Sequence, residues 1–327
     1  MILVTGATGM VGAHLVLSLL KEGKAVRALY RSEERRMELA ESSLFKSCPE
    51  HFDAIEWVCA DVRDVPALAE AFVNVKEVYH CAGYISFNPK DYRQLRTVNI
   101  EGTANVVNLS ISEGVEKLCF ISSIATLGNP KNGVISEGCF YNQEEDHNVY
   151  AITKYGAEME VWRASQEGVK VVIVNPGVIF GTGVQSKSMD VFTRVIKGLS
   201  YYTEGGSGFV GVADVVKACR FLMNGNYVNQ RYVLVSENLP YKTMLTWVAT
   251  ALAVSTPSKK ITKGTLKLIQ FLDAIKGVFT FGNRHFTKFT VASLDEVTNY
   301  SNEKIKETGF QFQPMKEVIE TCAVAYK

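Results

Sequence analysis

The sequence of 327 residues lacks the signs of several protein classes. Its seven cysteines are odd in number and show no C-x-x-C spacing, which argues against a disulfide framework and against a zinc site. We expect no metal ion, and reduced thiols indicate a reducing compartment, the cytoplasm. The formal net charge of +1 gives no long-range attraction to nucleic acid or anionic lipid. We therefore expect no nucleic-acid partner, and any anion must be bound by local geometry.

Segments that would target the chain to a membrane are also missing. The opening "MILVTGATG" has neither a basic n-region nor a small-residue cleavage site, so no signal peptide is expected. No window contains about 18 uncharged apolar residues. The nearest approach, Thr265–Gly282, is interrupted by Lys267, Asp273 and Lys276. We interpret it as an amphipathic helix covering a binding cleft, with a membrane-surface helix as the alternative, and expect no membrane partner.

Short apolar runs alternate with helix-like segments through the first two thirds of the chain. The runs cover residues 2–5, 25–30, 54–60, 77–82, 117–123, 169–175 and 231–236. Strands that alternate with helices predict right-handed βαβ units, and runs dense in Val, Ile and Leu are typical of strands buried on both faces. The predicted fold class is α/β: a Rossmann-type, doubly wound parallel sheet with a smaller C-terminal α+β substrate-binding region.

The alternation loosens after about residue 176, which indicates a second, smaller part built from several excursions. Residues 209–225 predict a helix that returns to the sheet. The predicted division is a dinucleotide-binding domain of residues 1–180 plus 209–236 and a substrate-binding region of residues 181–208 plus 237–327. We expect the two parts to pack together, with a cleft between them.

Three glycines, Gly6, Gly9 and Gly12, follow the first apolar run and open a helix. In this context the first glycine permits a tight turn, the second lets the backbone approach a pyrophosphate, and the third lets the helix pack on the sheet. The N–H groups and the positive dipole end of the helix favour phosphate. A purely structural turn is the alternative. The predicted phosphate-binding residues are these glycines with Thr8, Met10 and Val11.

The residues at the end of the second apolar run indicate whether the site prefers NAD or NADP. Where an NAD site carries an acid, this sequence has Tyr30, followed at once by Arg31 and then by Arg35 and Arg36. Guanidinium groups near the adenosine ribose suit a 2′-phosphate, so we predict NADP(H), with NAD as the second choice. A solvated, basic helix start beside glutamates is the alternative interpretation.

The stretch "ADVRD" ends the third run. Asp61 is predicted to accept a hydrogen bond from the adenine amino group, and Val62 to pack on the adenine ring. Alternatively, Asp61 or Asp64 caps the next helix.

A tyrosine and a lysine four residues apart, Tyr150 and Lys154, share one helix face. A nearby ammonium is expected to lower the tyrosine pKa towards a value useful for proton transfer, and it can also hold ribose hydroxyls. Tyr300 and Lys304 have the same spacing, so spacing alone does not identify the catalytic pair; we interpret the second pair as part of a surface helix. A strand-end serine, Ser122 or Ser123, would orient the substrate oxygen, and only one of the two can face the site.

These motifs, taken in order, resemble the extended short-chain dehydrogenase/reductase family. The set comprises Gly6-x-x-Gly9-x-x-Gly12, Asp61-Val62, "HCAG" (80–83), "VNIEGT" (98–103), "FISSIATLG" (120–128), Tyr150-x-x-x-Lys154 and "NPGVIFG" (175–181), within residues 1–235. The chain looks most like the reductase branch that includes dihydroflavonol 4-reductases and 3β-hydroxysteroid dehydrogenases.

The resemblance implies roles for particular residues. Ser123, Tyr150 and Lys154 would be catalytic, with Asn99 near the active site. Backbone N–H groups from residues 175–177 would lie near the nicotinamide carboxamide. The remaining cofactor-binding residues would be Cys81, Ala82, Gly83, Ser122, Asn175, Pro176, Gly177 and Val178, together with Lys154. It also implies a homodimer through a four-helix interface that includes the Tyr150 helix.

Departures from the family pattern narrow the activity. Ile124 and Ala125 stand where sugar dehydratases carry an Asp-Glu pair, so the acid and base for water elimination are missing. We predict an NADP(H)-dependent oxidoreductase that acts on a carbonyl or secondary alcohol of a small molecule; the alternative is an NAD-dependent nucleotide-sugar epimerase. Aromatic residues expected near the pocket favour an apolar or ring-containing substrate: Tyr84, Phe87, Tyr201 and Phe271.

Overall fold

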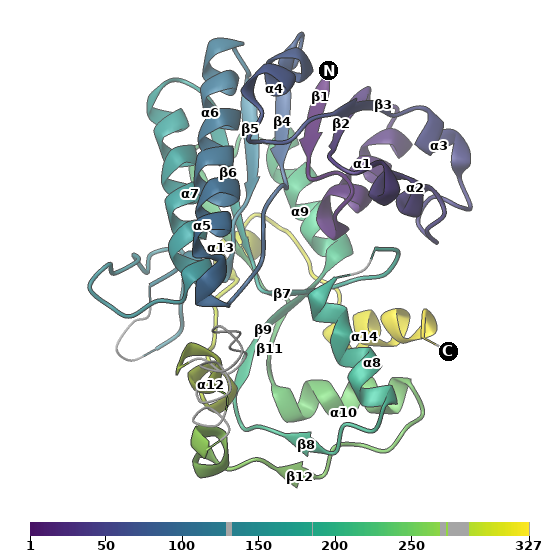
Figure 1. The fold of residues 1–327 in the computed structure, drawn as a ribbon, viewed down its shortest axis with the longest axis vertical. Helices are drawn as coiled ribbons and strands as arrows, with labels where there is room; N and C mark the ends of the chain where they lie inside the picture. Colours follow the sequence, from purple (N-terminus) through teal and green to yellow (C-terminus); the bar gives the residue numbers. More distant parts are fainter. Residues whose placement is uncertain (129–132, 185, 269–272, 274–287, 327) are drawn as a thin grey trace.

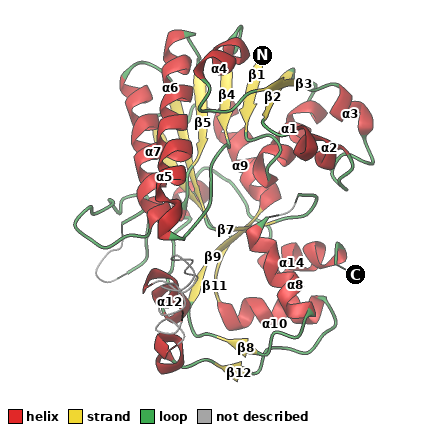
Figure 2. Ribbon diagram, viewed as in Figure 1, coloured by secondary structure: helices red, strands yellow, loops and turns green. Residues whose placement is uncertain are grey.

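The computed structural model contains a seven-stranded parallel sheet in the order β10-β6-β5-β4-β1-β2-β3 (Figures 1 and 2). It describes residues 1–128, 133–184, 186–268, 273 and 288–326. The strands are β1 Ile2–Thr5, β2 Val26–Tyr30, β3 Glu56–Cys59, β4 Glu77–His80, β5 Lys117–Ile121, β6 Lys170–Pro176 and β10 Gln230–Leu234. Each lies within one of the predicted runs or overlaps it, and the predicted α/β fold class is confirmed.

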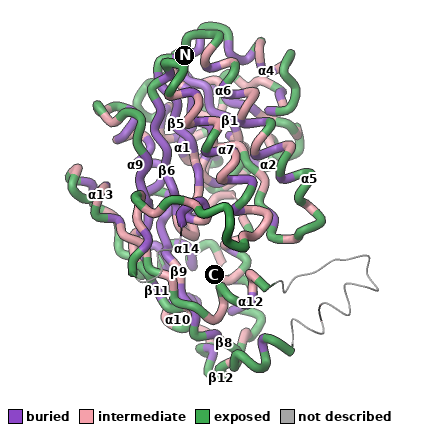
Figure 3. The backbone as a smooth tube through the Cα atoms, turned by 90° about the vertical axis from the view of Figure 1, so that its left-hand side faces the viewer, coloured by how far each residue is buried: buried purple, intermediate pink, exposed green. Residues whose placement is uncertain are grey.

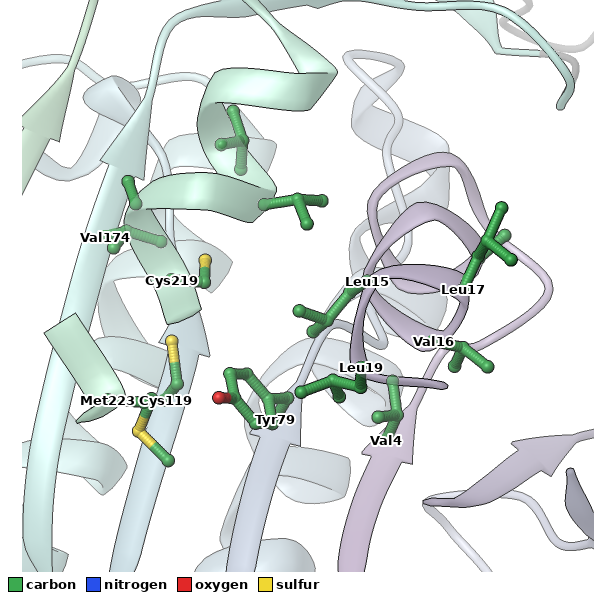
Figure 4. Close-up of a cluster of buried hydrophobic side chains, with 14 of the residues drawn as sticks. Val4, Leu15, Val16, Leu17, Leu19, Tyr79, Cys119, Val174, Cys219 and Met223 are labelled. Atoms are coloured by element: carbon green, nitrogen blue, oxygen red, sulfur yellow. The ribbon is translucent and has the colours of Figure 1, made fainter. Parts of the chain in front are cut away.

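Helices cover both faces of this sheet, as expected for strands that are apolar on both sides. One face carries α1 Met10–Lys21, α2 Glu33–Ala40, α3 Pro49–Asp53 and α9 Val212–Asn224; the other carries α4 Val65–Phe72, α6 Gly102–Ser112 and α7 Val149–Gln166. Figure 3 shows that the central strands β1, β5 and β6 are mostly buried. In the core of the first face, Tyr79 and Cys119 from the sheet meet Leu15 of α1 and Cys219 of α9 (Figure 4).

The chain reaches α6 through a short helix, α5 Tyr92–Leu95, and a π-helical turn, Arg96–Glu101. A π turn accommodates one residue more than an α-helical turn, and such turns are frequent at functional sites. The segment carries Asn99, which is 1% exposed.

A second sheet of three strands lies beside the carboxyl ends of the large sheet, in the order β11-β9-β7 (Figure 1). Its strands are β7 Val178–Phe180, β9 Gly206–Gly211 and β11 Glu237–Pro240. The prediction of a helix over 209–225 is therefore wrong for residues 209–211, which form a strand before α9 begins at Val212. Pairing with β7 and β11 decides their conformation. The division into two regions stays a prediction, and this sheet draws strands from both.

The C-terminal part also contains helices and a short strand pair. These are α8 Asp190–Ile196, α10 Tyr241–Ala251 and α14 Met315–Val324, with β8 Tyr201–Tyr202 paired to β12 Lys259–Lys260. Two further helices are α12 Lys288–Asp295 and α13 Glu303–Lys306. Among the described residues, no helix is long and apolar enough to cross a membrane. Most of the predicted amphipathic helix Thr265–Gly282, including Phe271, lies outside the described residues.

The predicted surface helix for Tyr300 and Lys304 is wrong. Helix α13 begins at Glu303, so Tyr300 precedes it, and the backbone of Tyr300 pairs with Ile135 instead. The ring of Tyr300 packs over Gly208, where an added Cβ would lie 3.0 Å from the ring. The Lys304 ammonium donates a hydrogen bond of 2.9 Å to the carbonyl of Arg231. This pair is therefore a structural contact between the C-terminal part and β10.

Lys117, at the start of β5, is a lysine with a structural role. Its side chain turns to the end of α9, where its ammonium donates at 2.8, 2.9 and 2.8 Å to the carbonyls of Leu222, Met223 and Gly225. The last carbonyls of a helix have no partner within the helix, and a cation there is favoured by the dipole. Lys117 is only 8% exposed, so these carbonyls have little access to water.

We expect Lys117→Met to lower the free energy of unfolding by about 2–3 kcal/mol, because it removes hydrogen bonds from a charged donor to buried acceptors. Urea unfolding at neutral pH measures the change. Lys170, the register partner of Lys117 on β6, is exposed, so Lys170→Met is the matched control and should change stability by less than about 0.5 kcal/mol. Equal effects from the two substitutions would contradict the capping role.

Candidate active site

In the turn between β1 and α1, neighbouring backbone leaves no room for a side chain at Gly6 or Gly12, whereas Gly9 faces open space. Gly6 has a φ of +65°, and an added Cβ would lie 2.6 Å from the Ala82 nitrogen. A Cβ on Gly12 would lie 2.2 Å from the Gly6 oxygen. A Cβ on Gly9, by contrast, would approach only the Gly6 oxygen, at 3.3 Å. The unfilled space at Gly9, beside the first turn of a 12-residue helix, fits a pyrophosphate.

The other residues predicted for this turn lie around the same helix start. Met10 and Val11 are the first residues of α1, and N–H groups in a first turn have no partner within the helix. The Met10 side chain points into the apolar core of the C-terminal part, so its contribution to a phosphate site is the backbone alone. Thr8 is half-buried in the turn itself.

The arginines after β2 differ in how far they are already paired. Arg36 is held by Glu33 and lies over the Tyr30 ring, with its guanidinium carbon 5.4 Å from the ring centroid. Arg31 is 62% exposed in its side chain and approaches Asp61 at 3.5 Å. Arg35 is similarly exposed and 3.5 Å from Glu38. Arg31 and Arg35 are therefore better placed than Arg36 to meet an anion.

Asp61 and Val62 have partners within the protein, and their predicted contacts with adenine stay predictions. The Asp61 carboxylate is bound by Arg63 at 2.9 and 2.8 Å, and this pairing lowers the pKa of Asp61 to about 2. Val62 is buried against α6, where a Cβ on Gly102 would lie 2.6 Å from its methyl group. Asp64, the alternative, caps α4 by accepting from the Ala67 N–H.

The segment after β4 lies between the glycine turn and the residues Asn99 and Lys154. Ala82 donates its N–H to the Thr5 hydroxyl at 3.1 Å, so the segment is fixed beside the glycine turn. Cys81 is half-buried, and desolvation raises the pKa of its thiol. At Gly83 an added Cβ would lie 3.6 Å from the Asn99 oxygen and 4.0 Å from the Lys154 ammonium.

Asn99 holds this segment in place. Its amide oxygen accepts from the Tyr84 N–H at 2.7 Å, and its amide nitrogen donates to the Tyr84 carbonyl at 3.1 Å and to the Thr153 hydroxyl at 3.2 Å. Both of its donor hydrogens are engaged, so Asn99 acts on position rather than on the reacting atoms.

The predicted trio of Ser123, Tyr150 and Lys154 converges beyond the carboxyl end of β5. Asn148 caps α7 by accepting from the Ala151 N–H at 2.8 Å, which starts the helix one residue before Tyr150. The Ser123 side chain lies beside the Tyr150 phenol, whose pKa it lowers, and its hydroxyl accepts from the Ala125 N–H at 3.2 Å. Of the two serines, of which only one was predicted to face the site, Ser123 is the one that faces Tyr150.

The charges in the site differ from the expectation. Burial raises the pKa of Tyr150 to about 12, although the neighbouring Ser123 hydroxyl opposes this, so the predicted lowering by Lys154 is not seen in the protein alone. Burial also lowers the pKa of Lys154 to about 7, against the opposing effect of Glu158. The Lys154 ammonium donates at 2.8 Å to the Ile121 carbonyl and lies 4.1 Å from the centroid of the Phe120 ring.

Several residues predicted to line the cofactor turn elsewhere. The Ser122 hydroxyl donates to Glu158 at 2.5 Å, and the Asn175 amide donates to the same carboxylate at 3.0 Å. The Gly177 N–H donates to Leu234 at 3.0 Å, so it is not free for a carboxamide. Pro176 is buried and has no N–H, and Val178 is half-exposed at the start of β7. The predicted contact from the 175–177 backbone is therefore not supported.

The sequence-based predictions gave no role to Glu158 or Arg231. Their side chains form a buried ion pair of 3.0 Å behind the trio. Glu158 lies four residues after Lys154, so the same helical spacing that linked Tyr150 to Lys154 could have drawn attention to it. Nothing in the sequence connects it to Arg231, which is 73 residues away.

Comparisons with known proteins identify the family. Residues 2–234 match the model of the NAD dependent epimerase/dehydratase family. Cinnamoyl-CoA reductase 1 of Petunia hybrida is 24% identical over 340 residues, covering 97% of this chain and 89% of the relative.

Solved structures have the same fold over nearly the whole chain. The crystal structure of gox2253 superposes with a TM-score of 0.82 at 26% identity, covering 99% of this chain and 97% of that one. The UDP-glucose 4-epimerase of Thermus thermophilus, solved with NAD, gives a TM-score of 0.74 at 21% identity, with 98% and 97% covered. With a family model that matches most of the chain, this protein belongs to the NAD dependent epimerase/dehydratase family and is an enzyme of the extended short-chain dehydrogenase/reductase type.

Proposed function

We propose that the protein is an NADP(H)-dependent oxidoreductase that interconverts a carbonyl group and a secondary alcohol. The observation that carries this proposal is the contact of Ser123 with Tyr150 beyond the carboxyl end of β5, with Lys154 one helical turn further on. Ligands of open α/β sheets bind at this edge. The nearby glycine turn provides the phosphate cradle on the same side.

The bound nicotinamide nucleotide would supply or accept the hydride. The Tyr150 phenol is protonated across the neutral range, because burial raises its pKa to about 12, so it can donate its proton to the substrate oxygen in the direction of reduction. Ser123 hydrogen-bonds the same oxygen as negative charge develops on it. Lys154 binds ribose hydroxyls and places positive charge close to Tyr150.

The absence of an acid at the end of β2 supports NADP(H) over NAD. Tyr30 occupies that position, and its ring packs against Trp57 with 6.0 Å between the centroids. Arg31 and Arg35, both exposed, then provide guanidinium groups for a 2′-phosphate.

We expect Arg31→Ala to raise the KM for NADPH about tenfold and to leave the KM for NADH unchanged, because one charge-assisted contact to the 2′-phosphate is lost. Steady-state kinetics with both nucleotides measure the effect. Arg36→Ala is the matched control, since Glu33 already pairs with that guanidinium. A change of equal size for NADPH and NADH in Arg31→Ala would rule out the 2′-phosphate contact.

Apolar side chains near Tyr150 favour a hydrophobic or ring-containing substrate. The Phe87 ring meets Tyr150 edge to face, with centroids 5.5 Å apart, and Phe87 is 52% exposed. Ile85, two residues earlier, is also exposed. Apolar surface of this kind is typical of pockets for apolar ligands.

The experiment that tests this function is a screen of hydrophobic aldehydes and ketones, including aromatic and polycyclic ones, with NADPH and loss of its absorbance as the readout. We expect turnover of at least one ketone. The competing function is the nucleotide-sugar epimerase, which the NAD-bound Thermus relative motivates. Tightly held NAD in the purified protein, with conversion of a UDP-sugar and no net oxidation, would replace our proposal. Dehydration is disfavoured because Ile124 and Ala125 provide no carboxyl group.

A further inference from the structure

Behind the Ser123–Tyr150–Lys154 trio lies a carboxylate that is completely buried. Glu158, on α7, is 0% exposed, and four side chains bind it. Its Oε2 accepts from Ser122 at 2.5 Å, Thr126 at 2.8 Å and Asn175 at 3.0 Å, and its Oε1 accepts from Arg231 at 3.0 Å. Burying a charge is unfavourable unless it is paired and hydrogen-bonded. The four donors explain how the protein can bury this carboxylate.

One of the groups that bind Glu158 also fixes the backbone of Ser123. The Asn175 amide nitrogen, which has two hydrogens, donates to the Ser123 carbonyl at 3.1 Å as well as to Glu158 at 3.0 Å. Because Ser122 and Ser123 point to opposite sides, the carboxylate holds one serine directly while the other presents its hydroxyl to Tyr150. A shift of Glu158 would therefore move Ser123.

Arg231 extends this connection to the loop before α7. Its guanidinium, besides pairing with Glu158, donates at 3.0 and 2.7 Å to the Glu137 carbonyl and at 3.2 Å to the Cys139 carbonyl. That loop packs closely on the end of the serine segment: a Cβ on Gly128 would lie 1.8 Å from the Phe140 oxygen. Glu158 and Arg231 thus join β10, the loop and the helix that carries Tyr150.

Glu158 is also the charged group nearest in sequence to Lys154 on the same helix face, one turn away. The other titratable groups around Lys154 are Tyr150 on α7 and His80 and Cys81 at the end of β4. Burial lowers the pKa of His80 to about 3, and burial raises the pKa of the Cys81 thiol, so both are neutral at pH 7. Glu158 therefore supplies the negative charge that opposes the desolvation of Lys154.

We propose that Glu158, paired with Arg231, is a positioning residue for this reaction: it fixes the backbone of Ser123 through Asn175, and its carboxylate, one helical turn after Lys154, is the counter-charge of that ammonium. The expected change in reaction rate rests on the proposed function, whereas the expected change in the titration of Lys154 does not. The two consequences can be measured separately.

The test is Glu158→Gln, which keeps the shape of the side chain and removes its charge. Without that charge the pKa of Lys154 falls further, so less of the lysine is protonated at neutral pH. We expect the basic limb of the kcat/KM profile for reduction to move down by about 1 pH unit. At pH 7 we expect kcat to fall about tenfold, since Ser123 is also held less firmly.

A readout independent of turnover is the pH titration of the Lys154 Cε resonance in ¹³C-lysine-labelled protein, with Lys154→Met to assign the signal. We expect its midpoint to move down by about the same 1 pH unit in Glu158→Gln. If the wild-type protein shows no reductase activity but the Lys154 titration moves as expected, the proposed function fails while the charge relation holds.

The matched control is Glu160→Gln on the same helix, whose partner Arg163 lies in a partly exposed ion pair of 3.0 Å. It should leave both the pH profile and the lysine titration unchanged. Should Glu158→Gln not fold, because Arg231 is left unpaired, the double variant Glu158→Gln/Arg231→Met removes both charges and takes its place. A folded variant with an unshifted Lys154 titration, or with activity lowered equally at every pH, would overturn the proposal.

Discussion

Replacing Tyr150 with phenylalanine is expected to lower kcat for ketone reduction by about three orders of magnitude, within the range typical of general acid catalysis. The phenol is the proposed proton donor, and the neighbouring Ser123 hydroxyl is too weak an acid to replace it. The ring itself stays, so the edge-to-face contact with Phe87 and the local packing are retained. Single-turnover kinetics with saturating NADPH measure the loss.

The same variant should bind NADPH with wild-type affinity, measured by the change in nicotinamide fluorescence. Tyr300→Phe is the matched control, because Tyr300 belongs to the other Tyr-x-x-x-Lys pair and packs against β9. It should retain full activity per folded molecule. Retained turnover in Tyr150→Phe would remove the tyrosine from the proposed mechanism.

Replacing Lys154 with methionine is expected to lower kcat/KM by about two to three orders of magnitude, as removal of a preorganised charge from an active site commonly does. Lys154 lies 4% exposed beneath the segment at Gly83, where its charge meets little competing water. The loss should fall on both nucleotide binding and the chemical step, because the same ammonium is proposed to do both.

The charge of Lys154 also determines how the rate of reduction depends on pH. The pKa of Lys154 is lowered to about 7, so the lysine is charged below that pH and neutral above it, while Tyr150, with its pKa raised to about 12, stays protonated. The rate of reduction should therefore fall as the pH rises through about 7, and this limb should be absent in Lys154→Met. A wild-type profile that is flat from pH 6 to 9, a range of about 3 units around that value, would contradict the assigned role.

The parts of the fold that could be predicted from the sequence are those with a local signal. The strand ILVT and the glycines after it lie next to one another in the chain, and the turn they form depends on little else. The three-stranded sheet had no such signal. β7 is three residues long, and residues 209–211 precede a helix with a similarly apolar sequence, so pairing between distant segments decides their conformation.

The candidate site divides in the same way. Tyr150 and Lys154 are linked by helical spacing, whereas the orientation of the Ser122 side chain depends on Glu158, 36 residues later, which accepts its hydrogen bond. The lowered pKa of Lys154 could not be predicted either, since it results from burial beneath segments that the tertiary fold brings together. Chemistry encoded by neighbouring residues was visible in the sequence, and electrostatics produced by packing was not.

The pairing of Glu158 with Arg231 has a consequence for the order in which the protein folds during synthesis. Strand β10, which carries Arg231, is the last strand of the large sheet to leave the ribosome and pairs at its edge with β6. Until it does, docking of α7 would bury the Glu158 carboxylate with its three hydrogen-bond donors but without a countercharge, which is unfavourable. We therefore expect α7 to dock fully only when β10 pairs with β6 and brings in Arg231.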